Sequence, residues 1–454
     1  NICRKANEEQ HDDMTTASST IMISFRHTEI IALFYSAIVF STSPTRALVL
    51  KAGERIPSRP ASAKDDATTS PRRSFPITDN CVVDDTNIRN VKKSLFDVRT
   101  VEEWGSNNGL EEHHLKKLYK VILDSPPPSL QQFESGSNTK LESVESLEKR
   151  LVESGFPRSR ASTMLSDFGY TCSIVRVDPS DSGGYKFVIQ LASGKLVETV
   201  LIRHERRNGH VRYTVCVSSQ VGCAKKCSFC ATGTMGMQQQ LRSGEILEQI
   251  FLAKNYLASS NRDNTQDNHQ IRNCVFMGMV EPLDNYDEVH EALRGLTHQC
   301  LYGMKAKHVT VSTVGASAQR IRQLADDAPQ ISLALSLHSA IQKSRESLIP
   351  SARATPIGSL GEALDYHAGK NGGRGAMLEY LLIDGVNDSD VEVDALAKFC
   401  QDRISSGSKV FVNLIPYNPT LAGDDFGYAT PTDDRINAFH ERLKRLGVKS
   451  LVRW

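Results

Sequence analysis

The sequence predicts an α/β protein whose main part is a partial, TIM-like (β/α)6 barrel. Apolar, β-rich runs alternate with helical patterns along the C-terminal half, and polar or tightly turning residues follow most of these runs. The six predicted strands are Tyr213–Ser219, Asn273–Gly278, Lys307–Thr313, Ile331–His338, Ala376–Ile383 and Lys409–Pro416. Because a full barrel of this kind has eight strands, six such units indicate an open one.

Residues 1–90 are predicted to be a targeting leader followed by a disordered linker. The chain begins at Asn1, and its uncharged apolar run Ile30–Phe40 is too short to cross a membrane but suits a signal-peptide core. A basic, Ser-rich stretch over residues 44–75 follows, as in organelle-targeting leaders. A buried helix or a mistranslated start is the alternative. If the leader is real, we expect a location in the plastid stroma or else the mitochondrial matrix, and otherwise a cytoplasmic one.

Residues 91–170 are predicted to form a small helical accessory domain. Leu110–Leu123 and Ser143–Leu151 carry apolar residues at helical spacing. Residues 171–212 change to an alternation with period two, and Asn208–Gly209 is a strong hairpin turn signal. We therefore expect a β-hairpin extension between the helical domain and the barrel.

Residues 213–430 are predicted to form the barrel core, and residues 431–454 a C-terminal helix with a truncated strand. Ser243–Leu257 and Thr432–Gly447 each show an apolar stripe at helical spacing. Active sites of parallel barrels lie at the carboxyl ends of the strands, so the polar residues that follow the predicted strands mark the expected site. No further run reaches the roughly 18 apolar residues of a membrane-spanning helix, and we expect no membrane partner.

Three of the ten cysteines form a C-x3-C-x2-C pattern, with Cys223, Cys227 and Cys230 on the loop after the first barrel strand. Three thiolates on one short loop can hold a cluster or a soft metal ion. A dedicated zinc site would need a fourth Cys or His close by, and none is there. The pattern therefore favours a 4Fe–4S cluster with one open iron, with zinc as the alternative.

Six longer motifs accompany the cysteines. They are Cys216–Cys223, Phe229–Gly233, Phe276–Pro282, Val311–Gly315, Ser336–His338 and Asn413–Pro419. With the cysteine pattern, these motifs resemble the RlmN/Cfr family of radical S-adenosylmethionine (SAM) enzymes, and the resemblance runs from about Leu95 to the chain end. It implies a radical SAM barrel and a methyltransferase that acts on C2 of adenine in RNA.

The resemblance also implies roles for particular residues. The cluster ligands would be Cys223, Cys227 and Cys230. The residues that would contact SAM are Val280, Glu281, Ser312, Ser336, Leu337, His338 and Asn418. Glu198 would be the proton acceptor, and Cys216 would be the thiol that resolves a covalent RNA–enzyme adduct.

In the family, one SAM methylates a cysteine of the enzyme near its C-terminus, and a second SAM is cleaved to a radical that activates this methyl group. The implied substrate is large-subunit (23S-type) rRNA, with tRNA as a further substrate. The implied partners are this RNA and an electron donor such as flavodoxin or ferredoxin. We expect a monomer.

Two departures from the family pattern stand out. Val280 replaces a glycine, which would remove the backbone freedom that glycine gives. The methyl-accepting cysteine is expected shortly beyond Trp454, so we expect this chain to bind the cluster and SAM without completing the methyl transfer. A truncated gene prediction is one explanation. The alternative is a non-catalytic paralogue that binds the cluster and RNA.

The net charge of +1 argues against a surface that wraps nucleic acid on all sides. Residues 201–230 nevertheless hold six basic residues against one acidic residue, and residues 436–454 hold five against one. We expect these two basic segments to contact RNA phosphates in a salt-sensitive way. A solvated charged face is the alternative interpretation of each.

Overall fold

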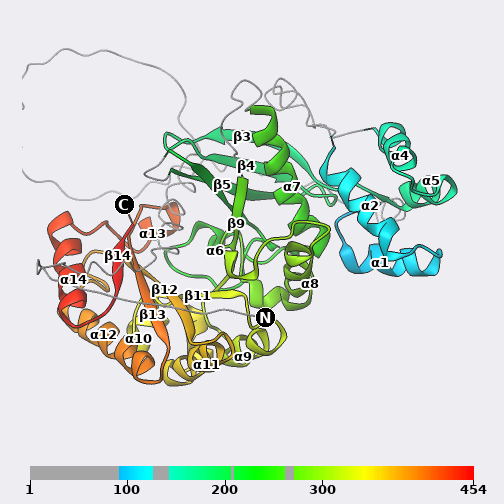
Figure 1. The fold of residues 1–454 in the computed structure, drawn as a ribbon. Coiled ribbons are helices and arrows are strands. Elements are labelled where there is room, and N and C mark those ends of the chain that lie inside the picture. The colour runs from blue at the N-terminus through cyan, green and yellow to red at the C-terminus, as the bar shows by residue number, and fades with distance from the viewer. Residues whose placement is uncertain (1–91, 126–142, 206–208, 261–269, 454) are drawn as a thin grey trace, which may run out of the picture.

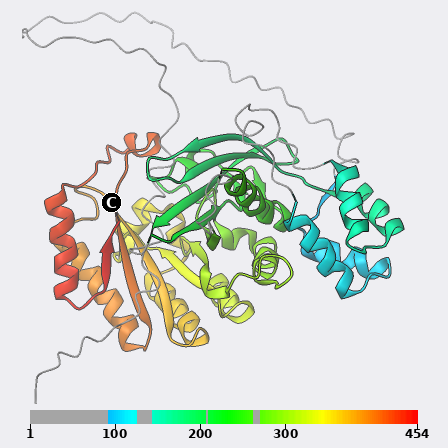
Figure 2. The same cartoon turned by 45° about the horizontal axis from the view of Figure 1, so that its top comes forward.

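The computed structural model describes residues 92–125, 143–205, 209–260 and 270–453, which form an α/β fold around one ten-stranded sheet (Figure 1). Helices follow one another around the outer side of the parallel part of this sheet, as Figures 1 and 2 show. This arrangement confirms the predicted α/β class with an open, partial barrel. The predicted leader at residues 1–90 lies outside the described residues.

The main sheet combines an antiparallel and a parallel part. The antiparallel strands are β3 (Ser173–Pro179), β4 (Tyr185–Gln190), β5 (Leu196–Glu205) and β6 (Val211–Val217). The strands parallel to β6 are β9 (Gln270–Phe276), β10 (Val309–Thr313), β11 (Ser332–Ser336), β12 (Arg374–Leu382), β13 (Lys409–Pro416) and β14 (Ser450–Val452). The spatial order is β14-β13-β12-β11-β10-β9-β6-β5-β4-β3.

The parallel part contains seven strands within the described residues. They are the six predicted barrel strands and β14, the strand expected after the C-terminal helix, which pairs with β13 and places Leu451 beside Asn413. The predicted hairpin is extended by β3, which pairs with β4. The sequence hides β3 because its outer residues are exposed at the sheet edge and break the apolar alternation.

Two short strand pairs and the helices complete the fold. The pairs are β1 (Lys93–Ser94) with β2 (Phe168–Gly169), and β7 (Gln220–Val221) with β8 (Gln239–Gln240). The N-terminal helices are α1 (Val98–Asn107), α2 (Glu112–Leu123), α4 (Val144–Glu153) and α5 (Arg158–Asp167). The later helices are α6 (Ala231–Thr234), α7 (Ser243–Ser260), α8 (Tyr286–Thr297), α9 (Ala318–Asp327), α10 (Gln342–Leu348), α11 (Ile357–Lys370), α12 (Asp390–Ser405), α13 (Leu421–Asp424) and α14 (Asp433–Arg445), with 3-10 turns at Pro282–Asn285, Ala306–His308 and Pro350–Ala354. None of the helices in the described ranges is both long and apolar enough to cross a membrane.

Helix α7 joins the N-terminal helices to the sheet and is buried on nearly every side. Phe251 contacts Phe96 and stacks on Tyr170, with ring centroids 4.9 Å and 5.4 Å apart. Tyr256, one and a half turns later, packs edge-on against Phe187 of β4. One helix therefore carries the apolar contacts to both parts, which explains why its apolar residues surround the helix instead of forming one stripe.

The buried carboxylate of Glu248 fixes the same junction by hydrogen bonds. It accepts the backbone N–H groups of Thr171 and Cys172, each at 2.8 Å, and the hydroxyl of Ser94. Burial raises the pKa of Glu248 to about 7, and these donors oppose the increase. The segment between β2 and β3 is therefore tied to α7 at one point.

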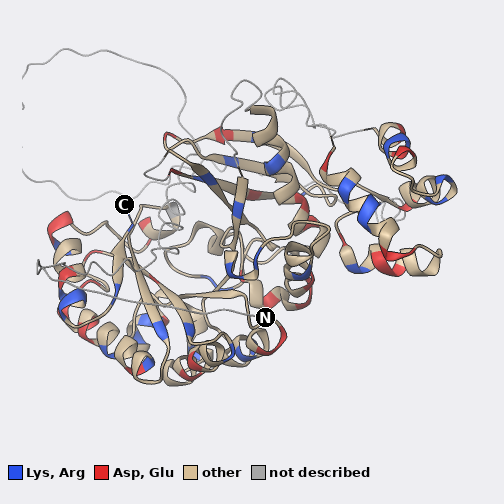
Figure 3. Cartoon of the chain, in the orientation of Figure 1, with Lys and Arg blue, Asp and Glu red and all other residues tan. Residues whose placement is uncertain are grey.

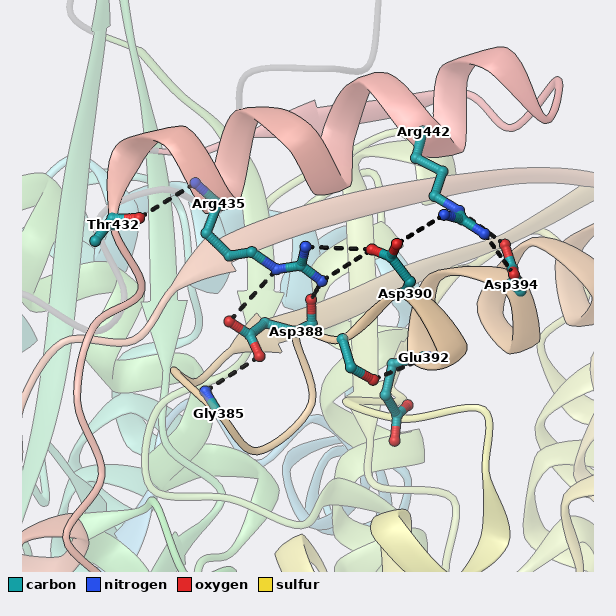
Figure 4. A network of polar contacts seen from close by, with 9 residues as sticks. Gly385, Asp388, Asp390, Glu392, Asp394, Thr432, Arg435 and Arg442 are labelled. Atoms are coloured by element: carbon teal, nitrogen blue, oxygen red, sulfur yellow. Dashed lines mark hydrogen bonds and ion pairs between the residues drawn. The ribbon is translucent and has the colours of Figure 1, made fainter.

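An ion-pair network joins α12 and α14 on the outer side of the barrel (Figure 4). Arg435 donates to Asp390 at 3.2 Å and pairs with Asp388, whose other oxygen accepts the N–H of Gly385. Arg442 reaches Asp390 at 2.9 Å and Asp394 at 2.6 Å. We call Asp388, Asp390, Asp394, Arg435 and Arg442 the α12–α14 network.

Candidate functional site

The cysteine loop is held in place by a tight backbone crossing. The β7–β8 pair closes it at its base, where a Cβ on Gly222 would lie 1.8 Å from the carbonyl oxygen of Gly236. Gly222 also has φ of +76°, so only glycine fits. Between the first two cysteines, Lys226 adopts the left-handed region with φ of +54° and reverses the chain.

Contacts with distant segments fix the far side of the same loop. The Ser228 N–H donates to the Leu348 carbonyl at 3.0 Å, and its hydroxyl lies 2.9 Å from that of Tyr428. The hydroxyl of Thr420 donates to the Phe229 carbonyl at 3.1 Å. The loop is thus attached to α10 and to the segment after β13, which holds its cysteines over the open end of the barrel.

A cavity of about 870 Å³, including its open mouth, lies under this loop at the carboxyl ends of the parallel strands. We call it the barrel-mouth cavity. Eight of the predicted site residues line it: Cys223, Cys227, Cys230, Val280, Glu281, Ser312, Ser336 and His338. Residues from four segments distant in the sequence therefore meet in one space, as the sequence predicted.

Glu281 connects two strand ends beside the cysteines. Its side chain is 2% exposed, and its two carboxylate oxygens accept the Thr313 hydroxyl at 2.7 Å and the Val314 N–H at 2.9 Å. Its own N–H donates to the Gln220 side chain at 2.7 Å. Burial raises the pKa of Glu281. Since both carboxylate oxygens are used within the protein, the carboxylate mainly orients the loops after β9 and β10.

His338 presents one nitrogen without a partner in the wall of the cavity. Its backbone is left-handed, with φ of +55°, and its Nδ1 accepts the Leu381 N–H at 3.0 Å. Burial, with the charge of Arg345, lowers its pKa to about 3, so the ring is neutral and its proton is on Nε2. That Nε2 is buried and has no hydrogen-bond acceptor in the structure. A ligand in the cavity can accept this bond.

Glu379 of β12 lines the same cavity, and the sequence analysis missed it. It is 4% exposed; one oxygen accepts the Asn413 amide at 3.0 Å, and the other has no partner. Strand register places it between Ser336 and Asn413. Burial raises its pKa to about 8. The signal that could have revealed it is a charged residue in the middle of the apolar run Ala376–Ile383.

The three thiols are the candidate ligands of a metal group, because all three line the cavity. Burial raises the pKa of Cys223 to about 11 and raises that of Cys227 well above its ordinary value. A metal group that binds these thiols must therefore displace their protons.

Comparison with known proteins decides the family. Residues 217–397 match the radical SAM superfamily. The chain is 35% identical over 341 residues to the ribosomal RNA large subunit methyltransferase N of Nitrosopumilus maritimus (strain SCM1), covering 68% of this chain and 92% of that relative. It is 38% identical to a probable dual-specificity RNA methyltransferase RlmN of Synechococcus sp. (strain JA-2-3B'a(2-13)), covering 68% of this chain and 81% of that relative. The chain belongs to the RlmN family of radical SAM RNA methyltransferases.

A solved structure supports the same assignment. A radical SAM methyltransferase from Sphaerobacter thermophilus superposes with a TM-score of 0.65 at 31% identity, covering 79% of this chain and 94% of that one. Membership in the RlmN family implies SAM and an iron–sulfur cluster as cofactors. Three cavity thiols, together with unpartnered polar atoms on His338 and Glu379, fit such a pair of ligands.

The two predicted catalytic residues lie outside the cavity lining in the described part of the chain. Cys216 is fully buried near the end of β6, and Glu198 of β5 forms an ion pair with Lys186 at 3.2 Å. Burial raises the pKa of Cys216, and the Glu198 carboxylate adds to the increase, so the two side chains are electrostatically coupled. Their roles in an RlmN-type reaction remain predictions.

Two predicted SAM contacts also lie apart from the cavity lining. Leu337 is fully buried, and Asn418 is half-buried in the turn after β13. The roles of both remain predictions. Val280, by contrast, lines the cavity with an ordinary backbone, since Lys226 and His338 alone among the described non-glycine residues have positive φ. The backbone freedom of a glycine is therefore not needed at this position.

Four basic residues of the two segments are paired with acidic residues. In the first, Arg203 pairs with Glu205 and Lys225 with Asp284, while Arg206 and Arg207 lie outside the described residues. In the second, Arg442 belongs to the α12–α14 network, Lys444 pairs with Glu441, and Arg453 is buried. Figure 3 shows basic and acidic residues mixed along the outer helices. RNA contact through these segments remains a prediction.

Proposed function

We propose that this protein methylates C2 of adenine in large-subunit rRNA, and also in tRNA, through a methyl-cysteine intermediate and a 4Fe–4S cluster. One observation carries the proposal. The three cysteines of the cluster motif line the same cavity as five of the seven predicted SAM contacts. The names of the RlmN relatives support RNA as the substrate class.

In this proposal, the side chains of the protein bind and orient the cluster and SAM. Cys223, Cys227 and Cys230 would hold the cluster, which, together with SAM, supplies the radical chemistry when bound. His338 offers an N–H donor and Glu379 an acceptor to the ligand, and the hydroxyls of Ser312 and Ser336 line the same wall. The apolar residues beneath the cysteine loop, including Leu381 and Ile415, exclude water from the reacting groups.

We also propose Glu198 as the proton acceptor and Cys216 as the resolving thiol. The influence of the Glu198 carboxylate on the Cys216 thiol supports a shared task, and the ion pair with Lys186 orients this carboxylate. An adenine that reaches this chemistry must leave its stack, so base extrusion is expected. A flavodoxin- or ferredoxin-type protein would deliver the electron.

The test uses the reading frame expressed to its stop codon and reconstituted without oxygen. The protein is incubated with SAM, a reductant and large-subunit rRNA or tRNA, and the nucleosides are analysed by mass spectrometry. We expect 2-methyladenosine, and with Cys216→Ala a covalent protein–RNA adduct that accumulates. A cluster-loaded protein that cleaves SAM but forms no 2-methyladenosine would overturn the methylation proposal. RNA binding without SAM cleavage would favour the non-catalytic alternative.

We propose, finally, an organelle location on the basis of the run Ile30–Phe40 and the basic stretch after it. A fluorescent protein fused after residue 91 should enter plastids or mitochondria. Uniform cytoplasmic fluorescence would contradict this.

A further inference from the structure

Arg345 on α10 is a fully buried cation that contacts the backbone of residues lining the barrel-mouth cavity. Its guanidinium donates to the carbonyl oxygens of Ser336, at 2.8 Å, and of Leu337, at the end of β11. It also donates to the carbonyl of Val314, just after β10. The side chain is 0% exposed. One arginine thus joins the ends of the two strands that carry Ser312 and Ser336.

These neutral partners do not balance the charge of Arg345. Within the described residues, no carboxylate accepts a hydrogen bond from its guanidinium, and its Nε–H has no acceptor. Burial lowers its pKa to about 10, so it is still a cation at neutral pH. An isolated buried charge is strongly unfavourable, and folded proteins rarely retain one without an anion nearby.

The cysteine loop packs against the helix that carries Arg345. The Ser228 N–H donates to the Leu348 carbonyl at 3.0 Å, and Cys227 belongs to the same buried cluster as Leu348. The Cys227 thiol and the Glu281 carboxyl are the electrostatic neighbours of Arg345. Cys227 becomes an anion when a metal group takes the place of its proton, so loading the loop adds negative charge beside Arg345.

We propose that Arg345 is a positioning residue of the cluster site. It serves as the fixed counter-cation of the anionic group held by Cys227, and its hydrogen bonds hold the ends of β10 and β11 together. The inference rests on the proposed function, because it requires a cluster at the three cysteines. Reduction adds one negative charge to the cluster, and a nearby cation in a poorly screened interior stabilises that charge. Arg345 thus raises the midpoint potential of the cluster and makes its reduction easier.

The experiment separates the charge of Arg345 from its hydrogen bonds. Arg345→Gln removes the charge and keeps an N–H donor. Arg345→Lys keeps the charge and loses the planar set of N–H donors of the guanidinium. The control, Arg403→Gln, changes a mostly buried arginine that pairs with Asp365 far from the cavity. Each full chain is reconstituted without oxygen, its iron content is measured, and its midpoint potential is determined by redox titration followed by electron paramagnetic resonance.

We expect a lower midpoint potential for Arg345→Gln than for the wild type, and unchanged potentials for Arg345→Lys and Arg403→Gln. Cluster uptake by Arg345→Lys but not by Arg345→Gln would also support the counter-cation. Equal potentials in the wild type and Arg345→Gln, or equal losses of cluster in both Arg345 variants, would overturn it. Failure of the wild type to take up a cluster would instead overturn the proposed function, and this inference with it.

A second measurement tests the bracing role. Arg345→Lys should bind SAM more weakly than the wild type in equilibrium titrations of the loaded protein, because the ends of β10 and β11 lose their shared donors. Unchanged SAM affinity in Arg345→Lys would show that these hydrogen bonds position nothing that SAM contacts.

Discussion

Charged groups in the α12–α14 network have oppositely charged partners within the protein, whereas polar and charged groups at the barrel mouth lack some of their partners. In the network, Arg435 and Arg442 each reach two carboxylates, and all of its groups except the mostly buried Asp388 lie on α12 or α14 (Figure 4). At the barrel mouth, the charge of Arg345 is met by carbonyl oxygens alone, and His338 and Glu379 each have one unpartnered polar atom.

This difference separates groups that stabilise the fold from groups that await a ligand. Surface ion pairs are complete within the protein and are individually weak. Buried polar groups without partners are unfavourable, so a concentration of them at one end of a barrel marks a place that other molecules complete. Changes in the two regions should therefore affect different measurements.

The largest effect is expected from Cys227→Ser. A serine hydroxyl does not ionise near neutral pH and is a poor ligand for iron, so cluster uptake and SAM cleavage should be abolished. Iron content and 5′-deoxyadenosine formation measure these losses. Cys400→Ser, at a buried cysteine of α12 away from the cavity, is the matched control and should keep both. A normal iron content in Cys227→Ser would remove this residue from the site.

Glu379→Gln should weaken SAM binding by about 10-fold or more, since a hydrogen bond to a charged group contributes roughly 1.5–3 kcal/mol. Equilibrium titration of the loaded protein measures the change. Glu441→Gln, an exposed substitution on α14, is the control. Wild-type affinity in Glu379→Gln would mean that the unpartnered oxygen does not meet SAM.

The same substitution should have the opposite effect on the stability of the ligand-free protein. Burial raises the folded-state pKa of Glu379 to about 8 from an ordinary value of 4.5. Between these pH values the folded state retains a proton that the unfolded state has released, so this group's contribution to stability falls as pH rises. The melting temperature of Glu379→Gln relative to the wild type should therefore rise from pH 5 to pH 8 and then level off. A difference in melting temperature between Glu379→Gln and the wild type that does not change with pH would contradict this prediction.

Arg435→Gln should reduce stability moderately and leave the site unchanged. It removes contacts to Asp390 and to Asp388, which is mostly buried, and we expect a loss of about 1 kcal/mol in the free energy of unfolding. Denaturant titration measures it. A change in SAM affinity or midpoint potential would show that the network and the barrel mouth are coupled.

The smallest effect is expected from Arg442→Gln. Its pairs with Asp390 and Asp394 lie at the solvent-exposed surface, where salt screens them. The melting temperature should fall slightly at low salt and match the wild type at about 1 M salt. A loss that persists at high salt would indicate a packing role for the arginine stem.

The sequence predicted features that depend on local spacing. The cysteine loop, the order of strands and helices, and the polar strand ends Ser312 and Ser336 could all be recognised because each signal lies within a few residues. Parallel strands then bring these ends together, whatever the details of packing. The barrel-mouth cavity therefore contains most of the residues expected there.

Features that depend on distant partners could not be predicted in this way. The pairing of Arg442 with Asp394 joins residues 48 positions apart, and it involves an arginine that the sequence analysis had expected to contact RNA. Glu379 is visible in the sequence only as a charge within an apolar run, and strand register is needed to place it between Ser336 and Asn413. The left-handed backbone of His338, which directs its ring, has no sequence signal either.

The buried guanidinium of Arg345 has a consequence for the lifetime of the protein in a cell. A fold that encloses an unbalanced charge is less stable when empty, and any ligand that binds only the folded state stabilises it by mass action. Newly made chains that have not acquired iron and sulfide should therefore unfold more often and be degraded sooner. The abundance of this protein would then follow the supply of its cofactor, without any dedicated regulator.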